Sequence, residues 1–319
     1  MESEKRAVSS WLDIPLTSFL PKLNLESLII TLILVLAVVS RFYDLGARVM
    51  SHDEINHVVP SWELYQGRSY AHDPVTHGPM QFHLVALSYF LFGDNDFTSR
   101  IPAAIFSIAT VAFTIFGMRR YLGRTGGIIA GLLMLISPYM LFYGRYTRNE
   151  AFVGLFAVLT LYAVLRYLEK GDSIALFILT ITTALHFATK ETAYIYTAQL
   201  LIFLGLVFLF RILKTYWQDE SKRNLFMILM AVAFILIFVV LSLAVYDASL
   251  EKAAAKSADP AVVETVATLS TTKILMIISV ILTAAAGVSA LIVLVRSLGW
   301  QAVRKERSFD MIVLIGSLI

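Results

Sequence analysis

The stretch SLIITLILVLAVVS, from Ser27 to Ser40, contains no charged residue and no regular alternation of polar and apolar positions. Extended to about Leu25–Phe42, it is long enough to cross the hydrocarbon core of a bilayer as a helix. The rest of the chain is similar: 58% of its 319 residues are hydrophobic and 15% are charged, and the mean hydropathy is +0.75. Because backbone groups in lipid must be satisfied within each segment, the sequence predicts an all-α, polytopic transmembrane helical bundle.

Further apolar runs predict seven more spanning helices and the start of a ninth at Phe309. These runs fall at about Arg100–Gly117, Gly126–Phe142, Ala151–Leu165, Ile174–Ala188, Ala193–Phe210, Leu225–Val245 and Ile274–Val295. One segment, Gly78–Gly93, is ambiguous, because its strictly apolar part covers only Leu84–Phe92.

The distribution of basic residues predicts on which side of the membrane each loop lies. Four short loops hold thirteen of the 26 basic residues. They share one side only if Gly78–Gly93 lies along the interface instead of crossing it, and short cytoplasmic loops are the ones enriched in Lys and Arg. We therefore expect a juxtamembrane helix at Gly78–Gly93, a cytoplasmic N-terminus and an external loop over residues 44–99.

Composition also excludes several classes of site. The chain has no cysteine, which rules out disulfides, thiolate nucleophiles and Cys-based metal centres. The net charge of +3 is explained by the basic loops between spans, so we expect no nucleic-acid partner.

Polar residues gather on the expected external face. Five of the six histidines, His52, His57, His72, His77 and His83, belong to the loop over residues 44–99, and the same face carries the carboxylates Asp53, Glu54, Asp73, Glu150 and Glu191. An ionisable group at mid-depth in the bilayer costs about 2.5–3.5 kcal/mol on insertion scales unless it is paired or solvated. The grouping therefore predicts a polar site at the external membrane boundary.

The neighbouring acids Asp53 and Glu54 have two interpretations. They can form the acidic first turn of a helix capped by Ser51, where their negative charges interact favourably with the positive end of the helix dipole. Alternatively, one carboxylate acts as a general base on an acceptor while its neighbour orients the site or a metal. The sequence leaves open which carboxylate does which.

Three cations lie on the expected external side, where the positive-inside rule predicts few basic residues. They are Arg145, Arg148 and Lys190. Local pairing of Arg148 with Glu150 and of Lys190 with Glu191 is one explanation. The other is that they are fixed donors for an anion at the lipid boundary, such as a lipid phosphate, for which Arg is well suited.

The stretch HDEINH echoes the H-E-x-x-H zinc motif, but His52 and His57 are five residues apart and do not share a helix face as an i, i+4 pair would. A zinc-protease site is therefore not expected. A looser divalent-metal site that uses His77 or Asp53 is an alternative to a hydrogen-bonded structural role.

The order of short motifs along the chain resembles the GT-C glycosyltransferases, in the branch that contains protein O-mannosyltransferases and bacterial lipid A aminoarabinose transferases. After the first helix and the external Asp-Glu pair come HGP, LFG, RIPAAIFS, RRYLG, SPYMLFYGRYTRNEAF and RYLEKG. The resemblance covers about residues 27–210 and is closest to a prokaryotic group linked to lipid-linked oligosaccharide pathways.

This resemblance implies a multi-pass enzyme of a prokaryotic cell membrane that transfers a sugar from a polyprenyl-phosphate donor to an acceptor on the non-cytoplasmic face. Asp53 then matches the catalytic acid, with Glu54 in support, and Glu150 matches the second acidic residue. Arg145 and Arg148 resemble residues that face the donor phosphate. The family's acidic-Lys-Pro turn is His77-Gly78-Pro79 here, so we expect Lys190 to supply the missing charge.

His77 and Glu191 are expected to give polar or metal-binding support to that site; the acceptor, a glycan, lipid or protein, is left open. The expected organisation is a cytoplasmic segment (1–26), a GT-C-like transmembrane catalytic module (27–246), and an external loop followed by the start of a C-terminal module that the chain truncates (247–319). A non-catalytic membrane subunit of a larger complex, or a flippase for a lipid-linked sugar, is the alternative function.

Overall fold

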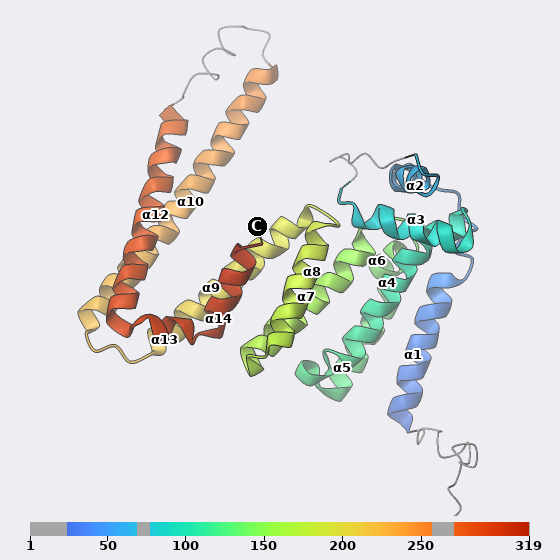
Figure 1. Cartoon of the computed structure of the whole chain (residues 1–319), viewed down its shortest axis with the longest axis horizontal. Helices are drawn as coiled ribbons and strands as arrows, with labels where there is room; N and C mark the ends of the chain where they lie inside the picture. Colours follow the sequence, from blue (N-terminus) through green and yellow to red (C-terminus); the bar gives the residue numbers. More distant parts are fainter. Residues whose placement is uncertain (1–23, 69–76, 257–270, 319) are drawn as a thin grey trace, which may run out of the picture. The chain divides into compact units, whose positions relative to one another are not determined.

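The computed structural model describes residues 24–68, 77–256 and 271–318, and all regular elements in these ranges are helices (Figure 1). The prediction of an all-α bundle is thus confirmed. The chain divides into two compact units, residues 1–199 and residues 200–317. Each unit is considered by itself below.

In the described residues of the first unit there are eight helices and the beginning of a ninth. They are α1 (Leu25–Phe42), α2 (His52–Tyr65), α3 (Met80–Phe92), α4 (Asp96–Phe116), α5 (Arg119–Ile136), α6 (Pro138–Tyr143), α7 (Glu150–Lys170), α8 (Ser173–Phe187) and α9 (Thr192–Lys214). The last of these continues into the second unit.

Asparagine caps start two of the long helices. Asn24 precedes α1 and Asn95 precedes α4, and each side chain accepts a hydrogen bond from the backbone N–H three residues later. Such caps satisfy N–H groups that have no partner within the helix. The two helices then pack with α5 through a buried apolar cluster of Ile30, Ile33, Ala37, Val111, Ile115 and Leu135.

The run expected at Gly126–Phe142 is divided in the structure. Helix α5 ends at Ile136, and Ser137 caps the short helix α6 by accepting from the backbone N–H of Met140. Pro138 occupies the first position of α6, where its missing N–H costs nothing. The expectation of one straight span here is wrong, because the Ser-Pro pair ends one helix and begins another.

The ambiguous segment Gly78–Gly93 forms α3, whose 13 residues span roughly 20 Å at about 1.5 Å per residue, less than the roughly 30 Å of hydrocarbon in a bilayer. Helix α3 packs on α2 and on α4, and it lies crosswise at the end of α4 (Figure 1). This arrangement supports the prediction that α3 does not span the membrane.

The second unit contains the rest of α9 with α10 (Glu220–Lys256), α12 (Thr271–Leu298), α13 (Trp300–Arg304) and α14 (Arg307–Gly316). Helices α10 and α12 pack side by side, and a buried cluster of Ile212, Trp217, Phe226, Ala290, Leu294 and Val303 joins α9, α10, α12 and α13. Helix α10 continues through Lys256, into the segment from residue 247 that is expected to form an external loop. Residues 257–270 lie outside the described part, and the boundary expected at 246/247 stays a prediction.

Six of the described helices are long and apolar enough to cross a membrane: α1, α4, α7, α9, α10 and α12. Helix α8, with 15 residues, and α3 are shorter apolar helices. The protein is accordingly a multi-pass membrane protein.

Candidate functional site

The buried carboxylate of Glu54 organises one end of the first unit. Its side chain is 0% exposed and accepts two bonds from Arg100 on α4, Nε to Oε1 at 2.8 Å and Nη2 to Oε2 at 3.0 Å. Arg48 donates to the same Oε2 at 2.8 Å. The backbone N–H groups of Ser51 and Thr147 complete its shell, at 3.1 and 3.2 Å. Glu54 thus ties the start of α2 to α4 and to the loop before α7.

The charge of Glu54 is stabilised where it lies. Burial raises the pKa of this carboxyl, but the hydrogen bonds from Arg100 and from the Ser51 and Thr147 amides outweigh it and hold the net pKa below its ordinary value. Glu54 is therefore an ionised anchor at neutral pH. Ser51 also caps α2, as expected, through a reciprocal capping box with Glu54.

Its neighbour Asp53 is different: the side chain is 53% exposed and lies 2.8 Å from Nη1 of Arg148. Arg148 Nε lies 3.7 Å from Glu150 Oε2, and Glu150 Oε1 accepts from Lys190 Nζ at 2.7 Å. The side chains of Glu150 and Lys190 are 11% and 17% exposed. Asp53, Arg148, Glu150 and Lys190, from α2, the α6–α7 loop, α7 and the α8–α9 turn, thus form one chain of alternating charges, which we call the charge chain.

The structure alters the expected local pairing of the cations. Arg148 does lie near Glu150, but its shorter contact is with Asp53. Lys190 pairs with Glu150, and not with its neighbour Glu191 as one interpretation expected. Glu191 is bonded to His77 instead, with Oε2 2.5 Å from Nδ1. The pairs therefore join segments far apart in sequence.

The HGP motif places His77 beside Glu191. The backbone N–H of Gly78 donates to Thr189 O at 3.1 Å, and that of Met80 donates to Ala188 O at 3.0 Å. A Cβ on Gly78 would lie 2.2 Å from Ala188 O, so only glycine permits this approach. The turn before α3 is thereby fixed to the α8–α9 turn that carries Lys190.

The expectation of a divalent metal at His77 or Asp53 finds no ligand set here. Among the described residues, no three His, Asp or Glu side chains are placed to share a metal ion. His77 and Glu191 give polar support to each other, and Asp53 is held by an arginine. Within the described ranges, His77, Glu191 and Asp53 therefore do not supply the several converging ligands that a metal centre needs.

A histidine without an assigned role lies within the site. His57 on α2 is buried and its ring stacks on His77 with centroids 6.0 Å apart. Among the residues that the structure describes, none forms a hydrogen bond with its Nδ1. Burial, with His77 and Arg148 nearby, lowers the pKa of His57 to about 4, so it is neutral at pH 7. Its position one turn after Asp53 on the same helix was the signal in the sequence that could have placed His57 within the site.

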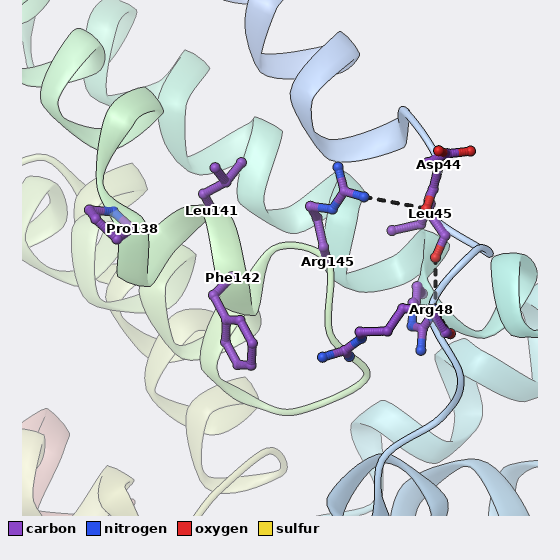
Figure 2. Close-up of a pocket in the computed structure, with 8 residues that line it drawn as sticks. Asp44, Leu45, Arg48, Pro138, Leu141, Phe142 and Arg145 are labelled. Carbon is purple, nitrogen blue, oxygen red and sulfur yellow. Dashed lines mark hydrogen bonds between the residues drawn. The ribbon is translucent and has the colours of Figure 1, made fainter.

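Arg145 lies apart from the charge chain. Its Nη1 donates to Ser40 O at 2.7 Å and its Nη2 to Asp44 O at 3.3 Å. It lines a separate cavity of about 380 Å³ together with Asp44, Leu45, Arg48, Arg100, Pro138, Leu141 and Phe142 (Figure 2). The three cations expected at one anion site are thus divided between two places.

The opposite end of this unit carries the basic loops. Arg120, at the start of α5, donates to Glu169 near the end of α7, with Nε 2.7 Å from Oε2, and Arg119 pairs with Glu26 in the first turn of α1. The beginnings of α1 and α5 and the end of α7 therefore meet, away from α2 and α3 (Figure 1). This matches the expected sorting of the loops onto two sides.

Sequence comparisons place the chain among known proteins. Residues 76–242 match the family described as dolichyl-phosphate-mannose-protein mannosyltransferase. The matched stretch contains the site residues from His77 to Glu191. Asp53 and Glu54 precede it. Two proteins named polyprenol-phosphate-mannose–protein mannosyltransferase, from Mycobacterium tuberculosis strains CDC 1551 / Oshkosh and ATCC 25618 / H37Rv, are each 29% identical to this chain over 155 residues.

That similarity covers 46% of this chain and 30% of each relative's length, so the chain spans less than a third of the proteins it resembles. No solved structure matches it. The family match nevertheless extends over more than half of the chain and includes Arg148, Glu150 and Lys190. The chain belongs to the dolichyl-phosphate-mannose-protein mannosyltransferase family.

Proposed function

We propose that this protein is an integral-membrane glycosyltransferase that moves a sugar from a polyprenyl-phosphate donor to an acceptor at the non-cytoplasmic face of the cell membrane. The observation that carries the proposal is the charge chain, which brings two acids and two cations together at the end of the bundle opposite the basic loops. The family match and the named activity of the mycobacterial relatives support the donor class.

In this reaction Asp53 is the general base. One oxygen of its half-exposed carboxylate accepts the proton of an acceptor hydroxyl as the hydroxyl oxygen bonds to the anomeric carbon. The bond from the anomeric carbon to the phosphate oxygen breaks on the opposite side, and the phosphate leaves with the bonding electrons. Attack opposite the leaving group inverts the anomeric centre, and a positioned base contributes about 10²–10⁴-fold to the rate.

Arg148 and Lys190 stabilise the charge that develops on the leaving phosphate. Each is already held by a carboxylate, at 2.8 Å from Asp53 and 2.7 Å from Glu150, so little reorganisation is needed when the phosphate arrives. Glu150 holds Lys190 in place and keeps the empty site close to neutral.

Glu54 acts here as a positioning residue, because its carboxylate is enclosed and fully bonded. Glu54 accepts a hydrogen bond from the backbone N–H of Thr147, which precedes Arg148 in the chain. Asp53 directly precedes Glu54. The Glu54–Thr147 contact therefore fixes the register at which Asp53 faces Arg148.

The test is a transfer assay in native membranes with radiolabelled polyprenyl-phosphate sugars, beginning with the mannose donor named for the relatives. Label is followed into lipid, glycan and protein fractions. We expect Asp53→Asn and Glu150→Gln to lower transfer at least about 10²-fold. Glu63→Gln, an exposed acid on the same helix as Asp53, is the matched control and should keep full activity. Donor binding without transfer by the wild type would favour a flippase or a non-catalytic subunit.

The proposed orientation can be tested separately, because the chain has no cysteine. Single cysteines at Glu63 and at Lys170 lie in exposed positions at the two ends of the first unit. In intact cells, a membrane-impermeant maleimide should label the cysteine at position 63 and leave the one at position 170 unlabelled until the membrane is opened. The reverse pattern would contradict an external site.

A further inference from the structure

Two arginines beside the cavity of Figure 2 are bonded to neutral oxygens. Arg41 is 0% exposed, and it donates to Ser107 Oγ, Ser40 Oγ, Leu135 O and Met134 O at 2.9–3.3 Å. Arg145 donates to the carbonyls of Ser40 and Asp44. Within the part of the chain that the structure describes, no carboxylate forms an ion pair with either guanidinium. A buried charge without a counter-charge is strongly unfavourable.

The charge around the cavity is correspondingly unbalanced. Arg48, Arg100 and Arg145 line it. Arg41 donates to Ser40 Oγ, and Arg145 donates to the carbonyl of the same residue. The nearby carboxylates in the described part of the chain are Glu54 and Asp44. Glu54 is fully occupied by Arg48 and Arg100. An anion in the cavity would offset the repulsion between Arg145 and Arg41.

The opposite wall of the cavity is apolar. Pro138, Leu141 and Phe142 come from the short helix α6, and Arg48 lies over the Phe142 ring with its guanidinium carbon 5.7 Å from the centroid. Figure 2 shows Leu141 and Phe142 on one side of the space and Asp44 and Leu45 on the other, with Arg48 and Arg145 between them. Phe142 is half-exposed, so this wall is open to the surroundings of the helix bundle. A ligand that fits has an anionic head and an apolar body.

We propose that this cavity binds the phosphate group of a membrane lipid, at a site separate from the charge chain. None of Asp53, Arg148, Glu150 and Lys190 lines it, so the phosphate held here is not the one that leaves during sugar transfer. Arg145 supplies paired donors suited to a phosphate, and about 380 Å³ accommodates a head group with the first carbons of its chains. The inference does not depend on the proposed transfer reaction.

The test measures lipid binding to the detergent-purified full chain by native mass spectrometry and by thermal shift. The probes are dioleoyl phosphatidic acid, dioleoylglycerol, which lacks the phosphate, and inorganic phosphate. We expect phosphatidic acid to bind and the other two to bind at least about tenfold more weakly. Arg145→Gln should weaken phosphatidic acid binding about tenfold (about 1.4 kcal/mol at 25 °C).

Two controls keep the result interpretable. Arg68→Gln removes an exposed cation outside this cavity and should leave binding unchanged. Asp44→Asn removes an acid that lines the cavity and should tighten binding about threefold; Asn tolerates the positive φ of 51° at this position. A gain in affinity, unlike a loss, cannot be explained by damage to the fold.

Equal losses in Arg145→Gln and Arg68→Gln would overturn the proposal, since binding would then follow net charge alone. Inorganic phosphate binding as tightly as phosphatidic acid would overturn the lipid part of it. Loss of sugar transfer with lipid binding intact would bear only on the proposed function.

Discussion

The two ends of the first unit both carry ion pairs, yet they differ in burial. At the end formed by α2 and α3, Glu54 and Arg100 are buried, and the pair of Glu150 and Lys190 is mostly so. At the other end, Arg120 and Glu169 are 51% and 41% exposed. Removing one partner of a buried ion pair leaves the other charge unpaired away from water, which is strongly destabilising. In an exposed pair, water solvates each charge when the partner is removed. The comparison indicates that the first end is held in a fixed geometry and that the second mainly marks a membrane side.

The largest expected effect is at Glu54. Glu54→Gln leaves Arg100 and Arg48 without their counter-charge in a buried position, and breaking a buried pair in this way costs about 3–5 kcal/mol. Thermal unfolding in detergent should show a clear fall in Tm. Asp53→Asn, next to it but half-exposed, should change Tm little while abolishing transfer. Similar Tm values for the two variants would contradict the distinction between anchor and reactive acid.

The next effect is at the glycine that joins the HGP turn to the α8–α9 turn. In Gly78→Ala the new Cβ meets the backbone of Ala188 and Thr189, which cannot rotate away, so the turn must move and strain costs about 1–3 kcal/mol. Tm and transfer should both fall, because His77 and Lys190 lose their relative position. The control is Gly205→Ala, where the added Cβ meets no atom within 4 Å; an equal loss there would contradict this explanation.

Much of the fold could be predicted from the sequence, because lipid imposes length and apolarity on each span. The run at Leu25–Phe42 matches α1 residue for residue, and the charge bias predicted that α3 does not span, in keeping with its length of 13 residues. The break at Ser137 was missed because the apolar run continues through it, although Ser-Pro is a helix-start signal. Composition averaged over a window does not detect such a local stop.

The site was less predictable, because its contacts join residues far apart in the chain. Asp53, Arg148, Glu150 and Lys190 were identified individually, but sequence neighbours suggested Lys190 with Glu191, whereas folding pairs Lys190 with Glu150. Arg100 was taken only as the start of a span. An arginine at the end of an apolar run requires a partner when it is buried, and that signal could have led to Glu54.

A smaller effect is expected from pH at His57. Its pKa of about 4 in the folded protein lies below the roughly 6.5 of an unfolded histidine. Between these values the unfolded chain binds the proton and the folded one does not, so this residue's contribution to stability is complete above pH 6.5 and is lost as the pH falls toward 4. The loss from pH 7 to 5 is on the order of 2 kcal/mol.

The measurement for His57 is the difference in Tm between pH 7 and pH 5. His57→Gln should reduce this difference relative to the wild type, because the variant has no proton to bind at this position. His52→Gln, which removes an exposed histidine from the same helix, is the control and should show the same Tm difference between pH 7 and pH 5 as the wild type. An unchanged pH dependence in His57→Gln would show that the burial of His57 is not linked to stability.

The smallest effect is expected at the exposed end. In Arg120→Gln the pair with Glu169 is lost, but water and lipid head groups solvate both side chains, so the Tm should stay within the scatter of replicate measurements. Lys190→Gln, which removes a cation of the same kind of pair from the mostly buried end, should lower Tm clearly under the same conditions, since Glu150 then loses its closest counter-charge. Equal shifts in the two variants would mean that burial does not separate the two ends, and that the geometry around Asp53 is held by the helices alone.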